Sequence, residues 1–265
     1  MTRIAIVLLL AAAVGVPGWA DLKVGATDAP AARLTPGAEL APRADDEVRT
    51  NYLPQSISVV VPPFRSASQQ KPPRNPRLFA PQDLGLLEPP DREAWQKPDQ
   101  VMDALRIAEG TTVADLGAGG GWFTMRLARR VGRQGKVYAV DVQRLMIEAI
   151  RRRVQREGLT NVVPVQGENF DPKLPADART DAVLIVDAFH EMEDPVLMLK
   201  NVSRTLRPHG RIGIIDYREG DGGPGPDAAA RVPPGVVISQ AADAGLKFVE
   251  QHKFLPYQYF LIFGK

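Results

Sequence analysis

The sequence of 265 residues contains no cysteine and only three histidines. Without a thiol the chain can form no disulfide, thiolate nucleophile or zinc–thiolate site. His209 and His252 have no metal-ligand spacing with another candidate ligand, so we predict no metal. The formal net charge is only +2 at pH 7, whereas domains that bind nucleic acid commonly show a strongly basic stripe. Nucleic acid is therefore not expected as a partner.

The one continuous apolar run lies near the N-terminus. Arg3 precedes an apolar run over Ile4–Val14, and Pro17 then breaks it before small residues. This order is typical of a secretory signal peptide, and the run is short for a membrane-spanning helix, which needs about 20 residues. We predict a signal peptide over residues 1–20 and an exported protein, periplasmic or extracellular. An uncleaved N-terminal membrane anchor is the alternative.

A proline-rich stretch follows this segment. Thirteen of the 24 prolines lie between Asp21 and Gln100, and proline interrupts both helices and central strands. We predict a largely disordered spacer over residues 21–90 and a folded domain over residues 91–265.

From residue 91 onward, strand and helix patterns alternate, which predicts parallel strands joined by right-handed crossovers. The last two strands are joined too closely for a crossover, so the last strand should be antiparallel. The prediction is a three-layer, Rossmann-like α/β fold of about seven strands. The expected strands cover residues 112–116, 136–140, 162–165, 182–186, 211–215, 248–254 and 257–263, and the expected helices cover 95–108, 122–131, 144–157, 195–206 and 237–244.

A glycine cluster separates the first expected strand from its helix. The spacing is G-x-G-x-G over Gly117, Gly119 and Gly121, directly after Asp115. Glycine lets the backbone approach a ligand closely, and this turn lies at the carboxyl ends of the strands, where ligands bind in such sheets. A dinucleotide fingerprint has glycine at the sixth position, where this chain has Trp122. A carboxylate before the loop also suits an ammonium group better than a pyrophosphate.

A second carboxylate, Asp141, ends the second expected strand. At that place it can accept hydrogen bonds from both hydroxyls of a ribose. Together the two acids and the glycines indicate a nucleoside ligand with a positively charged group.

The segment from Asp115 to Gly121 resembles motif I of the class I S-adenosylmethionine (SAM)-dependent methyltransferases. Residues 138–141 are similar to their second motif, and residues 166–170 follow the third strand where that family has an acid near the adenine. Residues 186–195 and 206–213 resemble the small-molecule type called methyltransferase type 11 or UbiE-like. The resemblance covers about residues 110–217.

The resemblance implies SAM as methyl donor and a role for each matching residue. Asp115, Gly117 and Gly119 would border the methionine part of SAM, and Gly121 belongs to the same loop. Asp141 would hold the ribose, and Asp187 would lie near the methyl group. Val142 would flank the adenine, whose edge Glu168 and Asn169 would contact. Capping of strand ends by Asp115 and Asp187 remains an alternative, as does core packing for Val142 and Phe170.

Methyl transfer needs mainly alignment of donor and acceptor, but a protonated acceptor also needs a base. His190 is the candidate catalytic base, because histidine titrates near neutral pH. The alternative is a supporting histidine bonded to Glu191 or to backbone. Tyr217, Arg218 and Tyr257 are candidates for the acceptor pocket.

These features predict a SAM-dependent methyltransferase that acts on a small-molecule acceptor, and they indicate no partner protein. An exported SAM-fold binding protein without catalytic activity is the alternative. A nicotinamide-dependent reductase conflicts with Asp115 and with the glycine spacing.

Overall fold

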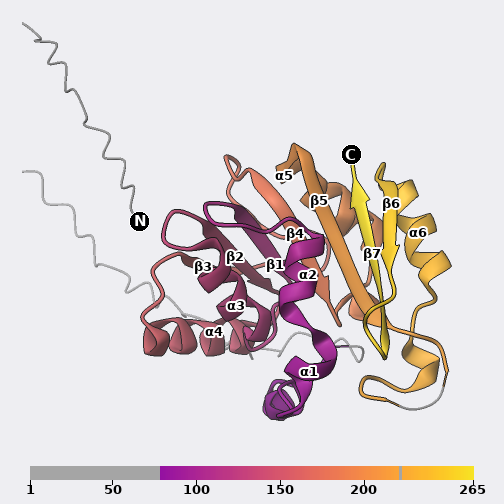
Figure 1. Ribbon diagram of the computed structural model, residues 1–265, viewed down its shortest axis with the longest axis horizontal. Helices are drawn as coiled ribbons and strands as arrows, with labels where there is room; N and C mark the ends of the chain where they lie inside the picture. Colours follow the sequence, from indigo (N-terminus) through magenta and orange to yellow (C-terminus); the bar gives the residue numbers. More distant parts are fainter. Residues whose placement is uncertain (1–77, 221–222) are drawn as a thin grey trace, which may run out of the picture. The chain divides into compact units, whose positions relative to one another are not determined.

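The computed structural model describes residues 78–220 and 223–265, which form a seven-stranded sheet flanked by helices (Figure 1). The strand order is β3-β2-β1-β4-β5-β7-β6. β7 is antiparallel to β5 and β6, and the other neighbours are parallel. The predicted fold class and the antiparallel last strand are therefore confirmed. The strands are β1 (Thr112–Leu116), β2 (Lys136–Asp141), β3 (Val162–Gln166), β4 (Thr180–Val186), β5 (Leu206–Tyr217), β6 (Lys247–His252) and β7 (Gln258–Gly264).

Helices cover both faces of the sheet, because alternate strand residues point to opposite sides. One face packs against α2 (Pro98–Ala104), α3 (Trp122–Val131) and α4 (Arg144–Glu157). The other face packs against α5 (Pro195–Thr205) and α6 (Pro234–Asp243). Both interfaces are made of fully buried aliphatic and aromatic side chains, which gives the three predicted layers.

Two predicted elements differ from the structure by more than three residues or by a break, and several others by one to three residues at an end. The helix expected over residues 95–108 is two helices, α1 (Arg92–Gln96) and α2, separated by Lys97 with a left-handed φ of 48°. Pro98 explains the break, because proline disfavours the helical conformation in the residue before it. The strand expected over residues 211–215 begins earlier, at Leu206, where it pairs with Thr180.

The described part of the chain begins at residue 78, before the predicted domain boundary at residue 91. A 3-10 helix, η1 (Pro81–Leu87), and the residues around it pack beside the glycine loop: a Cβ at Gly120 would lie 2.8 Å from Leu84 Cδ1. Residues 78–90 of the predicted spacer are thus part of the described structure, and Leu84 of η1 packs against the glycine loop. The predicted signal peptide and residues 21–77 of the spacer lie outside the described residues. Among the residues that are described, no helix is long and apolar enough to cross a membrane.

The order of the strands creates a crevice between two neighbouring strands. The chain leaves β1 toward β2 on one side, whereas β4 lies on the other side of β1. The loops after the two strands diverge there, and open α/β sheets bind ligands at such a point. The glycine loop after β1 and the residues after β4 therefore face one another.

Candidate functional site

A first cavity lies at the carboxyl ends of β1, β2 and β4, and the glycine loop forms one wall. Gly117, Ala118, Gly119 and Gly120 all line it. Gly117 has a φ of 75°, and a Cβ there would collide with the side chain of Ala188. Only glycine satisfies both the left-handed backbone and the close approach. The loop is thus built to bring backbone against a ligand.

Asp115 lies at the end of β1 on the wall of this cavity and is 3% exposed. The hydroxyl of Thr124, in α3, donates a 2.6 Å hydrogen bond to its Oδ2. Burial raises the pKa of Asp115 to about 6, although Thr124 and the charge of Arg92 oppose the rise. A cationic group in the cavity would compensate this buried carboxylate.

Asp141 ends β2 and borders the same cavity. Its Oδ2 accepts a 2.9 Å hydrogen bond from the backbone of Gly119, and its Oδ1 accepts one of 2.8 Å from the backbone of Gln143. Burial raises its pKa to about 6, against these hydrogen bonds. Asp141 therefore shapes the glycine loop as well as facing the space where the ribose is expected.

The residues expected near an adenine do not all reach the cavity. Val142, Glu168 and Asn169 line it. Phe170 is absent from the wall and is 46% exposed, so it does not pack in the core. Gly121 is also absent from the wall: it precedes α3 with a φ of 85° and begins that helix.

Asp187, directly after β4, holds a network of buried polar side chains. Arg92 Nη2 lies 3.3 Å from its Oδ2, the hydroxyl of Tyr217 donates a 3.2 Å hydrogen bond to the same oxygen, and Gln258 donates to Oδ1. Burial raises the pKa of Asp187 to about 7, although Arg92 opposes the rise. Its φ of 55° is uncommon outside glycine, and such strain often occurs at functional sites.

A second cavity opens on the other side of Asp187. It lies between the segment before α1, the residues after β4, and the loop after β5. Both cavities share the wall residues Phe79, Leu87, Arg92, Asp187 and Glu191. The two spaces therefore meet at the carboxyl end of β4, as a donor and an acceptor site would have to.

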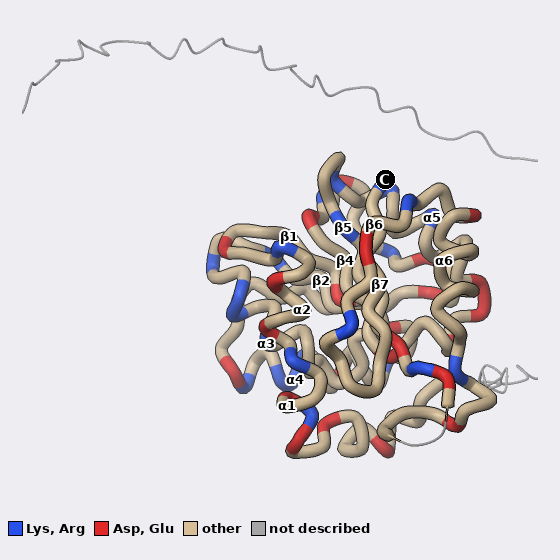
Figure 2. The backbone as a smooth tube through the Cα atoms, turned by 45° about the vertical axis from the view of Figure 1, so that its right-hand side comes forward, with Lys and Arg blue, Asp and Glu red and all other residues tan. Residues whose placement is uncertain are grey.

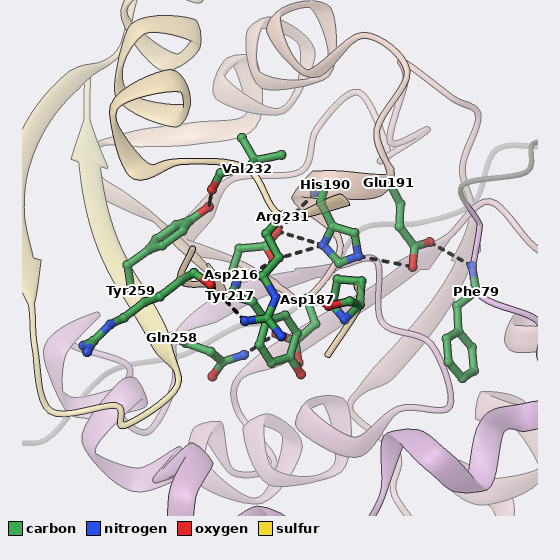
Figure 3. Close-up of polar contacts among 12 residues, drawn as sticks. Phe79, Asp187, His190, Glu191, Asp216, Tyr217, Arg231, Val232, Gln258 and Tyr259 are labelled. Atoms are coloured by element: carbon green, nitrogen blue, oxygen red, sulfur yellow. Dashed lines mark hydrogen bonds and ion pairs between the residues drawn. The ribbon is translucent and has the colours of Figure 1, made fainter. Parts of the chain in front are cut away.

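His190 lines the second cavity, and its contacts differ from those expected (Figure 3). Nδ1 lies 2.9 and 3.0 Å from the two carboxylate oxygens of Asp216 in β5. Nε2 lies 3.9 Å from Glu191 Oε1. Burial lowers the pKa of His190, but the hydrogen bond and charge of Asp216, with the charges of Glu191 and Asp187, leave this pKa above its usual value.

Glu191 borders both cavities and is connected to the N-terminal segment. Its Oε2 accepts a 3.1 Å hydrogen bond from the backbone of Phe79. Burial raises its pKa to about 7, although this hydrogen bond and His190 oppose the rise. His190, Asp187 and Glu191 thus form a group of neighbouring titratable side chains, each with a raised pKa.

A comparison with known families fits this geometry. The family described as "Methyltransferase domain" matches residues 107–248, more than half of the chain. The chain belongs to this methyltransferase-domain family. The match includes the glycine loop, Asp141, Asp187 and His190.

Individual relatives are also methyltransferases. Demethylmenaquinone methyltransferase of Listeria welshimeri is 28% identical over 122 residues, which cover 46% of this chain and 50% of that protein. Dimethylglycine N-methyltransferase of Parasynechococcus marenigrum is 32% identical over 144 residues, 52% of this chain and 51% of that protein. The chain thus spans about half the length of the curated relatives it matches.

A solved SAM-dependent methyltransferase from Aquifex aeolicus is similar over a longer region. It superimposes with a TM-score of 0.67 at 29% identity, covering 70% of this chain and 98% of that one. Nearly the whole of that structure can therefore be superimposed on this chain.

Of the three residues predicted for the acceptor pocket, one lines the second cavity and two do not. Tyr217 lines the second cavity. Arg218 donates to the backbone oxygen of Leu255, and Tyr257 packs edge-on against Trp95, so neither lines that cavity.

Sequence reasoning missed Asp216, and it missed the N-terminal wall that includes Phe79 and Arg92. Asp216 ends an apolar strand segment, as Asp141 does, so the same signal would have found it. Nothing comparable marks Phe79 or Arg92, which the proline-rich composition placed in or beside a spacer.

Proposed function

We propose that the chain is a SAM-dependent methyltransferase that transfers the methyl group to a small-molecule acceptor. The main support is the junction of two cavities at Asp187: one holds the glycine loop and two buried carboxylates, and the other holds His190. The relatives named above act on a demethylmenaquinone and on dimethylglycine by their names, which favours a small acceptor.

The residues of the first cavity fit SAM. Asp115 is a buried carboxylate with a raised pKa, and an ammonium group would offset the cost of its charge. Asp141 lies at the end of the next strand, where its oxygens can accept hydrogen bonds from ribose hydroxyls. Val142, Glu168 and Asn169 also line this cavity and could contact the adenine.

When bound, SAM supplies a methyl group already activated on a positively charged sulfur. The chain then has to hold an acceptor atom behind that methyl group and exclude water. Asp187, Glu191 and the ring of Phe79 border both spaces and define the line between them. His190 stands on the acceptor side, where it would take a proton from the acceptor.

The second candidate is a SAM-binding protein without catalytic activity. The two candidate functions are distinguished in two steps. The full chain is titrated calorimetrically with SAM, S-adenosylhomocysteine and NAD, and methyl transfer is then measured on a panel of acceptors. We expect both sulfur compounds to bind and NAD not to bind. Failure of both to bind at millimolar concentration would refute the proposal, and binding without turnover of any acceptor would favour the second candidate.

We also propose that residues 1–20 direct export of the protein. The support is the order of Arg3, the apolar run and Pro17 in the sequence. The test is N-terminal sequencing of the protein expressed with its leader, together with its distribution between periplasm, membrane and cytoplasm. A mature N-terminus near residue 21 in the periplasm is expected; an intact N-terminus in the membrane would favour the anchor, and one in the cytoplasm would refute export.

A further inference from the structure

Asp216, in β5, is a fully buried carboxylate that holds His190 at the wall of the second cavity. It accepts hydrogen bonds from the backbone N–H of His190 over 3.1 Å and from that of Tyr217 over 2.8 Å. Its oxygens also lie 2.9 and 3.0 Å from His190 Nδ1. Because a carboxylate accepts, Nδ1 carries the hydrogen, which leaves Nε2 of the neutral ring with a free lone pair.

The wall of the second cavity contains three aromatic residues, and two of its charged groups, Arg92 and Arg231, have partners inside the protein, whereas Asp227 is exposed. Phe79, Trp95 and Tyr217 contribute rings. Arg92 pairs with Asp187, and Arg231 donates to backbone oxygens of the loop after β5, including those of Pro226 and Gly220. Such a lining suits a flat neutral molecule better than a charged amino acid.

We propose that the second cavity binds a neutral ring hydroxyl compound as methyl acceptor, that His190 Nε2 accepts its proton, and that Asp216 is the positioning residue that orients His190. This inference rests on the proposed methyl-transfer function. A phenol is a weak nucleophile until it loses its proton, which makes a base in this place useful.

Two bonds break and two form in the transfer. The O–H bond of the acceptor breaks and its proton moves to His190 Nε2. An electron pair of that oxygen forms the new bond to the methyl carbon, while the methyl carbon–sulfur bond breaks and leaves its pair on the sulfur. The proton on His190 then passes to water when the products leave.

Several charged or titratable groups surround His190, and the test has to take them into account: Asp216 and Tyr217 on β5, Asp187 after β4, Glu191 in η2 (Phe189–Glu191), Arg92 on α1, Tyr259 on β7 and Arg231 in the loop after β5. Of these, Asp216 makes the direct hydrogen bond to the ring and raises the pKa of His190. Removal of its charge should therefore lower this pKa.

The first experiment measures His190 by long-range proton–nitrogen NMR in the full chain without cofactor. The chain has only three histidines, so His190→Asn and His209→Asn assign the signals. We expect hydrogen on Nδ1 of the neutral ring, and a lower His190 pKa in Asp216→Asn. Hydrogen on Nε2, or an unchanged pKa in that variant, would overturn the positioning role. The tautomer measurement uses the unaltered chain, so it decides the question even where Asp216→Asn does not fold.

The second experiment measures turnover of 2-naphthol, 4-nitrophenol and dimethylglycine. His190→Asn should lower kcat for 2-naphthol about 10²-fold or more, with SAM affinity unchanged. The loss should be smaller for 4-nitrophenol above its own pKa, because that hydroxyl is already ionised. His209→Asn, whose side chain is exposed at the start of β5, is the matched control.

The outcomes separate the inference from the function on which it rests. The acceptor class is wrong if the protein binds SAM but methylates only dimethylglycine, or methylates none of the three probes. The role of His190 as base is wrong if His190→Asn loses the same activity toward both phenols. Failure to bind SAM or S-adenosylhomocysteine overturns the proposed function itself. The NMR measurement tests the positioning of His190 by Asp216 independently of cofactor binding.

Discussion

The backbone amide of Phe79 donates a 3.1 Å hydrogen bond to Glu191 Oε2 and so connects the segment before α1 with the loop after β4. Two further contacts attach the same segment: Gln143 Nε2 donates to the Phe79 oxygen over 2.9 Å, and Arg153 pairs with Glu88 over 2.6 Å. Because this segment lines both cavities, we expect a ligand to enter or leave the first cavity beside it.

The first prediction concerns this connection. Glu191→Ala removes the acceptor for the Phe79 amide, so the segment should open more often. We expect S-adenosylhomocysteine to dissociate several-fold faster, with a smaller change in its association rate. Stopped-flow fluorescence measures both rates, and Asp243→Ala, at the exposed end of α6, serves as control. An unchanged dissociation rate would show that the segment does not limit release.

The second prediction concerns Asp141. Asp141→Ala should weaken SAM binding by roughly 1.5–3 kcal/mol, the usual value of charge-assisted hydrogen bonds. The structure adds a second effect, since the Gly119 amide loses its acceptor in the same variant. Calorimetric titration gives the affinity. Asp181→Ala removes a carboxylate near the opposite end of the parallel strands, where it accepts from the Thr112 amide, and should leave the affinity unchanged. Equal losses in both variants would refute the ribose assignment.

The third prediction separates backbone strain from crowding in the glycine loop. Gly110 and Gly117 both have positive φ, but only a Cβ at Gly117 would meet another side chain, that of Ala188. Gly110→Ala should therefore cost about 1–2 kcal/mol of unfolding free energy, for strain alone. Gly117→Ala should cost more and should also weaken SAM binding. Urea unfolding and titration measure the two effects; similar values for both variants would mean that the loop moves aside easily.

The fold was predictable from the sequence because its signals are local. The strand Thr112–Leu116 and the helices Trp122–Val131 and Arg144–Glu157 have the predicted bounds. In each of these elements the apolar residues recur with a single regular spacing, and a glycine directly follows its last residue. The helix expected over residues 95–108 failed where Pro98 interrupts a pattern that is otherwise continuous.

That most of the residues predicted to bind SAM line one cavity was predictable for a different reason. In a parallel sheet, acids at the ends of strands reach a common edge, so their positions along the chain indicate proximity. The same signal marks Asp216, but its contact with His190 also depends on the pairing of β4 with β5, which the order of elements along the chain does not give. The wall formed by Phe79 and Arg92 depends on packing of a segment whose composition indicates disorder.

The fourth prediction concerns the buried pair of Arg92 and Asp187, whose side chains are 8% and 12% exposed. Arg92→Met leaves a buried carboxylate without its cation and should cost about 3–5 kcal/mol of unfolding free energy. Adding Asp187→Asn should restore much of this loss, because the uncompensated charge disappears. Chemical denaturation of the two single variants and the double variant gives the coupling. Additive losses would show that the pair is not coupled.

The last prediction concerns protons released on cofactor binding. Asp115 and Asp141 have pKa values raised to about 6, mainly by burial, so a part of each is protonated just below neutral pH. A bound cation favours the ionised form and lowers both pKa values. SAM binding should therefore release protons near pH 6, and its affinity should rise with pH until it levels off above about pH 7.

Calorimetric titration in buffers of different ionisation enthalpy counts these protons. Asp115→Asn can still accept from the Thr124 hydroxyl but cannot ionise, so it should release fewer protons and show a flatter dependence of affinity on pH. Asp181→Ala should behave as the unaltered chain does. Proton release that is the same in Asp115→Asn would mean that Asp115 keeps its protonation state on binding, and that the positive charge of the cofactor is compensated by another group of the site.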